Sequence, residues 1–370
     1  MVGVLGCGDH IVEVRRIARF ARDGSGLVPV RVRDPIRLSG VVGGSYTRTF
    51  DAWGPATITV EGGSACANML SRIEPLAWEV RIIRGTETAY SGPILRVRQT
   101  SGEPGVTIEC GDILSWFAED GAGMINLVDM DYADTDPVDI AYDVITQAMA
   151  ATDPPDNLLI TDYLYRNPVG EGIDYAPGVT ADYIMDTLDE LTDYGLMYAA
   201  VGRRIILSSP ATIDRAVVAR LSTADLTDGV EVTVDGTDMA VMGVAVRDGD
   251  PPAAFVAGSA GTRWGTPMVR VDVDEGVSDR SALTAARRAI QGRSRPRVHV
   301  AMPSNVSLRA SAPIRFRDLR PGSAHVTLDI RDIPRPVRQS LMITDVTVDF
   351  TQSSEDVRVT FDPLGEPTQI

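Results

Sequence analysis

The fold class of this chain is indicated most clearly by residues 75–98, PLAWEVRIIRGTETAYSGPILRVR. In the first half of this stretch, apolar residues such as Trp78 and Val80 alternate with charged ones, and Arg84-Gly85 supplies a turn before a second strand. Alternation with a period of two residues around a glycine turn is typical of an antiparallel hairpin with one buried face. The stretch holds no catalytic pattern, so it predicts a wall element of a structural protein.

Strand patterns dominate both ends of the chain. Ser64 is expected to cap a short helix before the hairpin, and Asp112 is expected to cap a helical turn through Trp116 after it. A further helix is predicted over residues 278–291, with an apolar face made by Leu283, Ala286 and Ile290. Additional strands are predicted at 45–50, 56–61, 106–109, 298–302, 325–331, 341–350 and 356–361.

The middle of the chain reads as mixed helix and strand. Asp136 followed by Pro137 is a strong helix start, because the carboxylate caps the helix and proline suits its first position. A second helix is expected to be capped by Thr180 and to bury Ile184, Leu188 and Leu191. A hairpin is predicted over 196–208, with its turn at Gly202.

Charge divides the chain into three parts. Residues 1–118 carry 13 arginines and 12 acidic residues, residues 119–275 carry 8 and 29, and residues 276–370 carry 14 and 10. This division predicts two near-neutral end domains, 1–118 and 276–370, around an acidic α+β middle at 119–275. The short strands at the ends suggest a small barrel or sandwich, so the predicted fold class is α+β and β-rich, with two small barrel-like domains. An acidic middle in a chain of net charge −16 repels nucleic acid, which argues against sequence-specific DNA binding.

Bulk composition favours a globular protein. Hydrophobic residues make up 44% of the chain, and no apolar run approaches the roughly 20 residues that a membrane span needs. The three cysteines, Cys7, Cys66 and Cys110, are far apart, so reduced and mostly buried thiols are expected rather than a disulfide framework.

The carboxylates and histidines of the chain match no known catalytic or metal-binding motif. The acidic residues between Asp129 and Asp143 lack the glycine and the terminal glutamate of a calcium loop, which favours helix capping and leaves a cation site as the alternative. His10, His299 and His325 form no zinc-hydrolase motif, and no serine lies in a GxSxG elbow, although a dispersed triad is not excluded by sequence. No catalytic residue, metal or cofactor is therefore predicted.

Four tryptophans could stack on sugars, but packing in the core or at an interface is the favoured interpretation. They are Trp53, Trp78, Trp116 and Trp264.

The order of these segments resembles the minor tail proteins, and especially the tail-hub proteins, of long-tailed actinobacterial phages. The N-terminal elements that carry the resemblance are Gly6-Cys7-Gly8-Asp9, Tyr46-Thr47-Arg48, the strand at 56–60, the helix around Cys66, the hairpin with Trp78, Arg84-Gly85 and Gly92-Pro93-Ile94, and Asp112 to Trp116. The C-terminal elements are the helix at 281–290, Phe316-Arg317-Asp318-Leu319-Arg320-Pro321-Gly322, and the strand pair at 341–348 and 355–360.

This resemblance implies a structural virion protein at the tail tip with a fold like that of baseplate hubs. It implies a homotrimeric ring in which two barrels per chain match a sixfold tail tube, around a channel for DNA, with the distal tail ring, the tape measure and tip proteins as partners. The structural or interface candidates are Trp53, Trp78, Arg84, Gly85, Gly92, Pro93, Trp116, Phe316, Asp318 and Gly322. The alternatives are a hexameric ring of the distal-tail type, a cell-wall-degrading tail-tip enzyme and a receptor- or carbohydrate-binding module.

Overall fold

The computed structural model describes residues 4–17, 20–23, 26–29, 34–101, 105–151, 164–168, 170–209, 217–237, 239–247, 253–259, 265–273, 278–290, 293 and 297–370. It is 16% helical and 49% strand, which confirms a β-rich fold with few helices. The chain forms two compact units, Met1–Gly229 with Pro303–Leu364, and Val230–Met302 with Gly365–Ile370.

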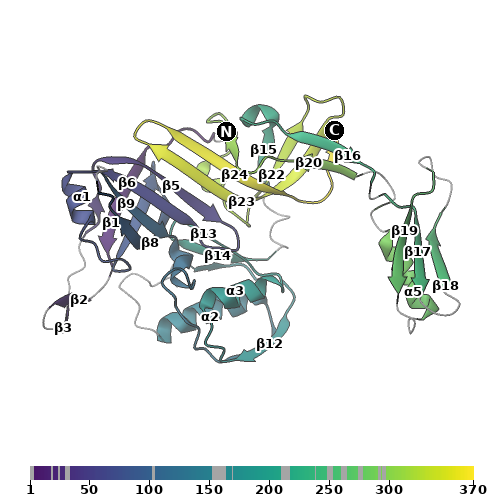
Figure 1. Cartoon of the computed structure of the whole chain (residues 1–370), viewed down its shortest axis with the longest axis horizontal. Helices are drawn as coiled ribbons and strands as arrows, with labels where there is room; N and C mark the ends of the chain where they lie inside the picture. The colour runs from purple at the N-terminus through teal and green to yellow at the C-terminus, as the bar shows by residue number, and fades with distance from the viewer. Residues whose placement is uncertain are drawn as a thin grey trace. The chain divides into compact units, whose positions relative to one another are not determined.

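One large sheet organises the first unit (Figure 1), with strands in the order β15-β22-β23-β5-β6-β9-β8-β7-β1-β4. In addition, β24 pairs with β23, and β21 pairs with β24, in the same sheet. Its strands are β1 (His10–Arg16), β4 (Ile36–Arg37), β5 (Val41–Thr49), β6 (Pro55–Glu61), β7 (Trp78–Arg84), β8 (Glu87–Arg98), β9 (Gly105–Gly111), β15 (Val217–Ser222), β21 (Val306–Leu308), β22 (His325–Ile330), β23 (Val337–Thr351) and β24 (Glu355–Pro363). A separate hairpin joins β2 (Phe20–Asp23) and β3 (Gly26–Pro29).

The hairpin predicted at 75–98 is confirmed as β7 and β8. Arg84 pairs with Glu87, so the turn consists of Gly85 and Thr86, and Gly85 adopts a φ of +61° that favours glycine. Val80 and Ile82 are fully buried, whereas Arg81 between them is exposed. The predicted alternation therefore holds over residues 80–82, whereas Glu79 departs from it, because its carboxylate is buried and pairs with Arg203 at 2.8 Å.

Strands from the two ends of the chain pair directly within this sheet. β5 runs antiparallel to β23, with Tyr46 opposite Val348 and Thr47 opposite Thr347. The hydroxyls of Thr47 and Thr347 lie 3.1 Å apart. Since the described strands pair as an open path, the two separate barrel-like domains are not confirmed.

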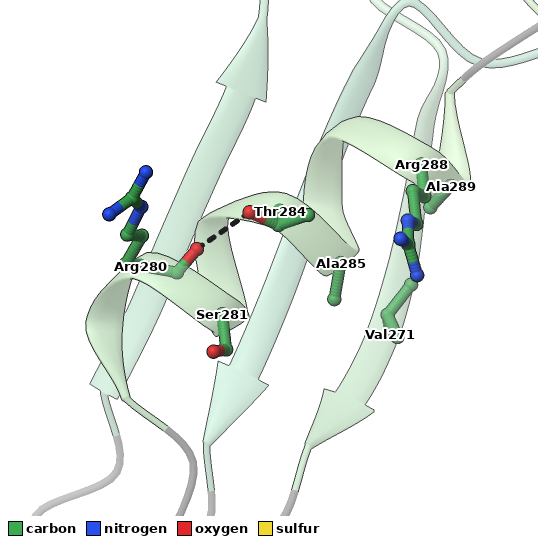
Figure 2. A pocket seen from close by; sticks show the side chains of 7 residues that line it. All are labelled: Val271, Arg280, Ser281, Thr284, Ala285, Arg288 and Ala289. Carbon is green, nitrogen blue, oxygen red and sulfur yellow. Dashed lines mark hydrogen bonds between the residues drawn. The ribbon is translucent and has the colours of Figure 1, made fainter.

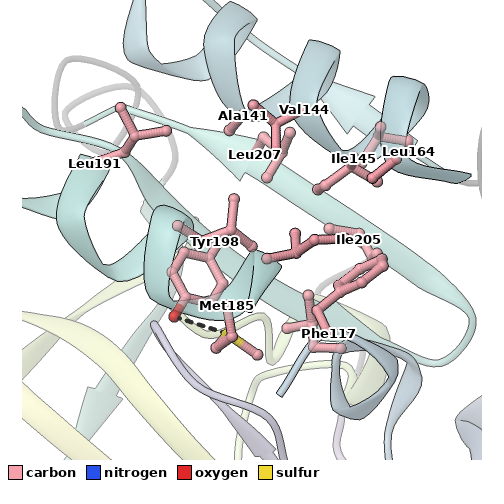
Figure 3. Packing of buried hydrophobic residues seen from close by; sticks show 14 of the residues in the cluster. Phe117, Ala141, Val144, Ile145, Leu164, Met185, Leu191, Tyr198, Ile205 and Leu207 are labelled. Atoms are coloured by element: carbon pink, nitrogen blue, oxygen red, sulfur yellow. Dashed lines mark hydrogen bonds between the residues drawn. The ribbon is translucent and has the colours of Figure 1, made fainter. Parts of the chain in front are cut away.

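A second layer carries the helices α2 and α3 and the hairpin β13–β14 (Figure 1). Its elements are the 3₁₀ helix η1 (Ile113–Trp116), β10 (Met130–Thr135), α2 (Pro137–Ala151), β11 (Leu164–Arg166), β12 (Ile173–Gly178), α3 (Ile184–Thr192), β13 (Met197–Val201) and β14 (Arg204–Ser208). Figure 3 shows apolar side chains from α2, α3, β13 and β14 meeting Phe117, which follows η1, in one core.

The two predicted helix starts in this layer have different outcomes. Asp136 caps α2 as predicted, because its Oδ1 accepts the N–H of Val138 at 2.8 Å. The predicted cap at Thr180 is wrong, since α3 begins at Ile184 and Tyr183 takes the cap position without a side-chain hydrogen bond. The backbone carbonyl of Met124 accepts the N–H of Ile184 at 3.1 Å, so a tertiary contact replaces a side-chain cap.

Short helices complete the first unit. Ser64 caps α1 (Ala65–Leu70) as predicted, accepting the N–H of Ala67 at 3.0 Å. Asp112 caps η1 as predicted, accepting the N–H of Leu114 at 2.8 Å. Elsewhere among the described residues, 3₁₀ helices form at η3 (Thr223–Asp225) and η4 (Phe316–Asp318).

The second unit packs one helix on one face of a small sheet. Its elements are β16 (Glu231–Asp235), β17 (Met242–Arg247), β18 (Ala253–Gly258), β19 (Met268–Val273), α5 (Asp279–Ala289), β20 (Arg297–Ala301) and β25 (Thr368–Gln369). Ala282 and Ala286 of α5 are fully buried against Ala245 of β17. A Cβ on Gly243 would lie 2.1 Å from the carbonyl oxygen of Ala286, so glycine permits this close packing.

Candidate functional site

Arg84, at the end of the β7 strand, ties three parts of the first unit together. Its guanidinium donates to both carboxylate oxygens of Glu355 at 2.6 and 2.8 Å, and to the backbone carbonyls of Leu5 and Gly6 at 3.2 and 3.0 Å. The side chain of Glu355 is only 3% exposed. Burial lowers the pKa of Arg84, but the hydrogen bond and charge of Glu355 outweigh it, so the pKa is raised.

Phe316 extends this junction to the C-terminal part of the first unit. The guanidiniums of Arg48 and Arg84 both lie 4.4 Å from the centroid of its ring. Arg48 is buried and donates to the carbonyl oxygens of Ala89 and Leu319 at 3.0 and 3.1 Å. The structure therefore brings together two residues singled out in the sequence, Arg84 and Phe316.

His10 occupies the other side of Glu355. Its ring stacks on Phe350 at a centroid distance of 4.3 Å, and its Nε2 lies 3.4 Å from Glu355 Oε1 and from Tyr46 Oη. Burial lowers the pKa of His10, against the raising effect of Glu355. The His10 ring thus fills a packed position in contact with Phe350, Glu355 and Tyr46. This arrangement suits a structural junction.

A second polar cluster surrounds the loop from Phe50 to Gly54, which connects β5 and β6. Asp112 Oδ2 accepts the N–H of Gly54 at 2.7 Å, and Tyr90 Oη donates to the carbonyl of Gly54 at 2.9 Å. Burial raises the pKa of Asp112 to about 7, although three backbone N–H contacts lower it. Trp53 donates from Nε1 to Asp120 at 2.9 Å, which anchors the loop to the second layer.

The same loop contacts α3 and β13 through Asp51, Tyr198 and Asp189. The N–H of Tyr198 donates to Asp51 Oδ1 at 2.9 Å, and its hydroxyl donates to the Asp51 carbonyl at 2.9 Å and to Asp189 Oδ1. Burial raises the pKa of Asp51 to about 7, and burial also raises the pKa of Asp189. Figure 3 shows the Tyr198 ring at the edge of the apolar core, with its hydroxyl near Met185.

The other candidate residues from the sequence serve packing and backbone geometry. A Cβ on Gly92 would lie 2.1 Å from the carbonyl oxygen of Gly111, so this position admits only glycine without movement. Gly322 has a φ of +68° beside Phe50, and Asp318 pairs with Arg315 at 2.6 Å. Gly92, Pro93, Trp116, Phe316 and Gly322 are buried, Trp53, Trp78, Arg84 and Asp318 are half-buried, and Gly85 is exposed.

Acidic side chains of the segment between Asp129 and Asp143 form hydrogen bonds and an ion pair with nearby groups of the same layer. Asp136 Oδ2 accepts the N–H of Gly170 at 2.8 Å, Asp139 pairs with Arg166 at 2.6 Å, and Asp143 accepts from Gln147 at 2.9 Å. Among the described residues no group of three histidine, cysteine or acidic side chains is placed to hold a metal ion. Of the two carboxylates expected to cap the helix, Asp136 does so through the N–H of Val138, whereas Asp139 forms an ion pair with Arg166.

An open hollow of about 690 Å³ lies along α5 in the second unit (Figure 2). It is lined by Arg280, Ser281, Thr284 and Arg288 together with small apolar side chains, and the Thr284 hydroxyl donates to the Arg280 carbonyl at 2.8 Å. Trp264, one of the four tryptophans considered for sugar stacking, lies outside the described residues. Within the described part of the chain, none of the helices is both long and apolar enough to cross a bilayer.

Sequence reasoning missed the burial of Arg48 and the role of Glu355. A usable signal exists for Arg48, because Tyr46 and Arg48 are two residues apart on β5 and both face the core. An arginine at an inward position of a strand implies buried acceptors, here two backbone carbonyls. Glu355 gives no such signal, since its partner Arg84 is 271 residues away in the sequence.

Solved structures with a similar fold include a prophage tail protein and a chain of a PdpA–VgrG complex, whereas no protein-family model and no curated protein matches the chain. The 43 kDa tail protein of prophage MuSo2 from Shewanella oneidensis has a TM-score of 0.50 at 10% identity, over 96% of each chain. A chain of the lidded Francisella PdpA–VgrG complex has a TM-score of 0.51 at 10% identity, over 100% of this chain and 55% of that one. The chain therefore shares the fold of a phage tail protein and of a component of the PdpA–VgrG complex.

Proposed function

We propose that the chain is a structural tail protein of a phage virion, and more specifically the hub at the tail tip of a long-tailed phage of an actinobacterial host. In this role it joins the tail tube to the tip and surrounds the channel through which DNA passes. The observation that carries the proposal is the fold shared with the MuSo2 tail protein over 96% of both chains.

The composition of the buried junctions supports a structural role. The arginine junction and the carboxyl cluster hold strands and loops of one chain to each other, because Arg84, Arg48 and Tyr198 donate to neighbouring groups of the same chain. Buried networks of this kind rigidify a fold, and their donors point at the chain itself rather than at a substrate. We accordingly propose a protein without enzymatic activity or cofactor.

The ring that we propose is a homotrimer. Each chain contributes its N-terminal part (1–118) and C-terminal part (276–370) to the wall, and the acidic residues of the middle part (119–275) line the channel, which discourages adhesion of DNA. Candidate residues with exposed surface, namely Trp53, Trp78 and Gly85, contact neighbouring subunits or the distal tail ring, the tape measure and tip proteins. The buried candidates hold the wall itself.

Native mass spectrometry of the purified chain tests the ring. The proposal predicts a species with three copies of the 39.7 kDa chain. A hexamer would instead favour a ring of the distal-tail type, and a strict monomer at all concentrations would contradict a self-assembling hub. A zymogram on host cell wall, with clearing that depends on a single carboxylate, would contradict the absence of enzymatic activity.

A further inference from the structure

The loop between β5 and β6 is held to the helical layer by carboxyl groups for which the described part of the chain supplies no basic partner. Asp51 lies in the loop, Asp189 on α3 and Asp112 just before η1. The hydroxyl of Tyr198 on β13 lies among them and donates to Asp189 and to the Asp51 backbone. A tyrosine hydroxyl has one proton, so it satisfies these acceptors only in part and neutralises none of them.

Other charged groups around this cluster are also acidic. Asp186, one helix turn before Asp189, raises the pKa of Asp189, and Asp189 raises the pKa of Asp51. Asp345 on β23 lies opposite Thr49 in the sheet, and burial raises its pKa as well. The charges that act on Asp51 and Asp189 are therefore carboxylates from α3, whereas β13 supplies only uncharged side chains.

The loop is also set by unusual backbone geometry. Asp51 has a φ of +51°, which a non-glycine residue adopts at a cost unless the surroundings hold it. Here the Asp51 N–H donates to the Tyr198 carbonyl at 2.9 Å, and the Tyr198 N–H donates back to Asp51 Oδ1 at 2.9 Å. Loss of these contacts would allow Asp51 to leave its strained backbone conformation. Weaker contacts with Tyr198 therefore favour opening of the loop.

We infer that Asp51, Asp189 and Tyr198 form a pH-sensitive latch that holds the β5–β6 loop on α3 and β13 when the carboxyls are protonated and loosens when they ionise. Protonated carboxyls share hydrogen bonds with Tyr198 without mutual repulsion. Ionised carboxylates repel each other across the same small, partly buried space. The loop then separates from the helical layer while the large sheet remains intact.

The direction of the effect follows from the raised pKa values. A carboxyl whose pKa is higher in the folded than in the unfolded state stabilises the fold fully below the unfolded pKa near 4. That stabilisation is lost as the pH rises through the folded pKa, which for Asp51 is about 7. The latch is therefore closed at pH 5.5 and weakened at pH 8.5.

Hydrogen exchange measured by mass spectrometry on the full chain tests the latch. After correction for intrinsic exchange rates, we expect opening of peptides that contain Asp51 and Tyr198 to be at least ~tenfold more frequent at pH 8.5 than at pH 5.5. Peptides from the β7–β8 hairpin serve as the internal control and should change less than about twofold.

Asparagine variants separate titration from packing. Asp51→Asn with Asp189→Asn keeps the acceptor oxygens, and asparagine tolerates the left-handed backbone at position 51, so the pH dependence should fall below about twofold. Asp193→Asn, on the exposed end of α3, is the matched control and should keep the wild-type profile. If the double variant does not fold, each single variant should reduce the pH dependence. An unchanged profile in the asparagine variants, or no pH dependence in the wild-type loop, would overturn the latch.

Discussion

At the scale of single residues, the fold depends on charged side chains that are buried with their partners. Arg84 joins the hairpin turn to the N-terminal segment and to Glu355 at the start of β24. Removal of one partner leaves the other charge buried without compensation, which costs more than the ion pair itself contributes. Arg84 is therefore more important for stability than an exposed arginine on the same hairpin.

We predict that Arg84→Met lowers the free energy of unfolding by about 3 kcal/mol, because Glu355 would lose both hydrogen bonds of the guanidinium. Urea unfolding measures the change. Arg96→Met is the matched control, since Arg96 pairs with Glu109 at the surface and should cost less than about 1 kcal/mol. Equal effects of the two substitutions would contradict the importance of the junction.

We predict that even the nearly isosteric substitution Asp112→Asn destabilises the fold. The two oxygens of Asp112 accept separate backbone N–H groups, from Leu114 and Gly54, and the amide of asparagine has only one acceptor. Asp112→Asn should therefore lower the melting temperature, by an amount that corresponds to about 2 kcal/mol. Asp120→Asn keeps the acceptor for Trp53 and should leave the melting temperature within a degree or two. An unchanged melting temperature in the Asp112→Asn variant would argue against the capping geometry.

At the scale of elements, local patterns predict hairpins and most helix starts, whereas long-range contacts escape them. The alternation around Gly85 predicts the β7–β8 hairpin, and the Asp136–Pro137 pair predicts the start of α2. Both predictions are correct because each signal is contained within a few residues. The start of α3 is different, because the carbonyl of Met124 satisfies its first N–H and no local cap is needed. Likewise, no sequence pattern near Tyr46 predicts that β5 pairs with β23.

The crossing of β8 with the segment after β9 gives a prediction of its own. A Cβ at Gly92 would overlap the backbone of Gly111 and Asp112, and backbone atoms cannot move aside as a flexible side chain does. Gly92→Ala should therefore cost about 2 kcal/mol of the free energy of unfolding. Gly105→Ala, on β9, meets only ordinary contacts at 3.4 Å or more and should cost less than about 1 kcal/mol. Similar losses for both substitutions in a chemical denaturation series would refute the close approach.

At the scale of the whole molecule, the first unit is built from both ends of the chain. Residues 1–118 lack β23, which pairs with the edge of β5, and they also lack the helices that pack on Phe117. An uncovered strand edge and an exposed apolar face both favour aggregation. We therefore expect fragment 1–118 to aggregate when it is expressed alone.

Deletion of residues 230–302 should have the opposite outcome. The N–H of Thr227 donates to the Ser307 carbonyl at 3.0 Å, so a short glycine–serine linker can span the deletion and keep the first unit folded. Circular dichroism and size-exclusion chromatography distinguish a folded product from an aggregate. A soluble 1–118 fragment together with a misfolded deletion variant would contradict the shared sheet.

The hub ring that we propose can be examined by cryo-electron microscopy of the phage whose genome encodes the chain, because a reconstruction of the virion gives both the position and the copy number of the protein. We expect three copies in a closed ring at the tail tip, around a lumen lined by acidic side chains. Absence of the chain from the tail, or a single copy without a ring, would contradict the proposal.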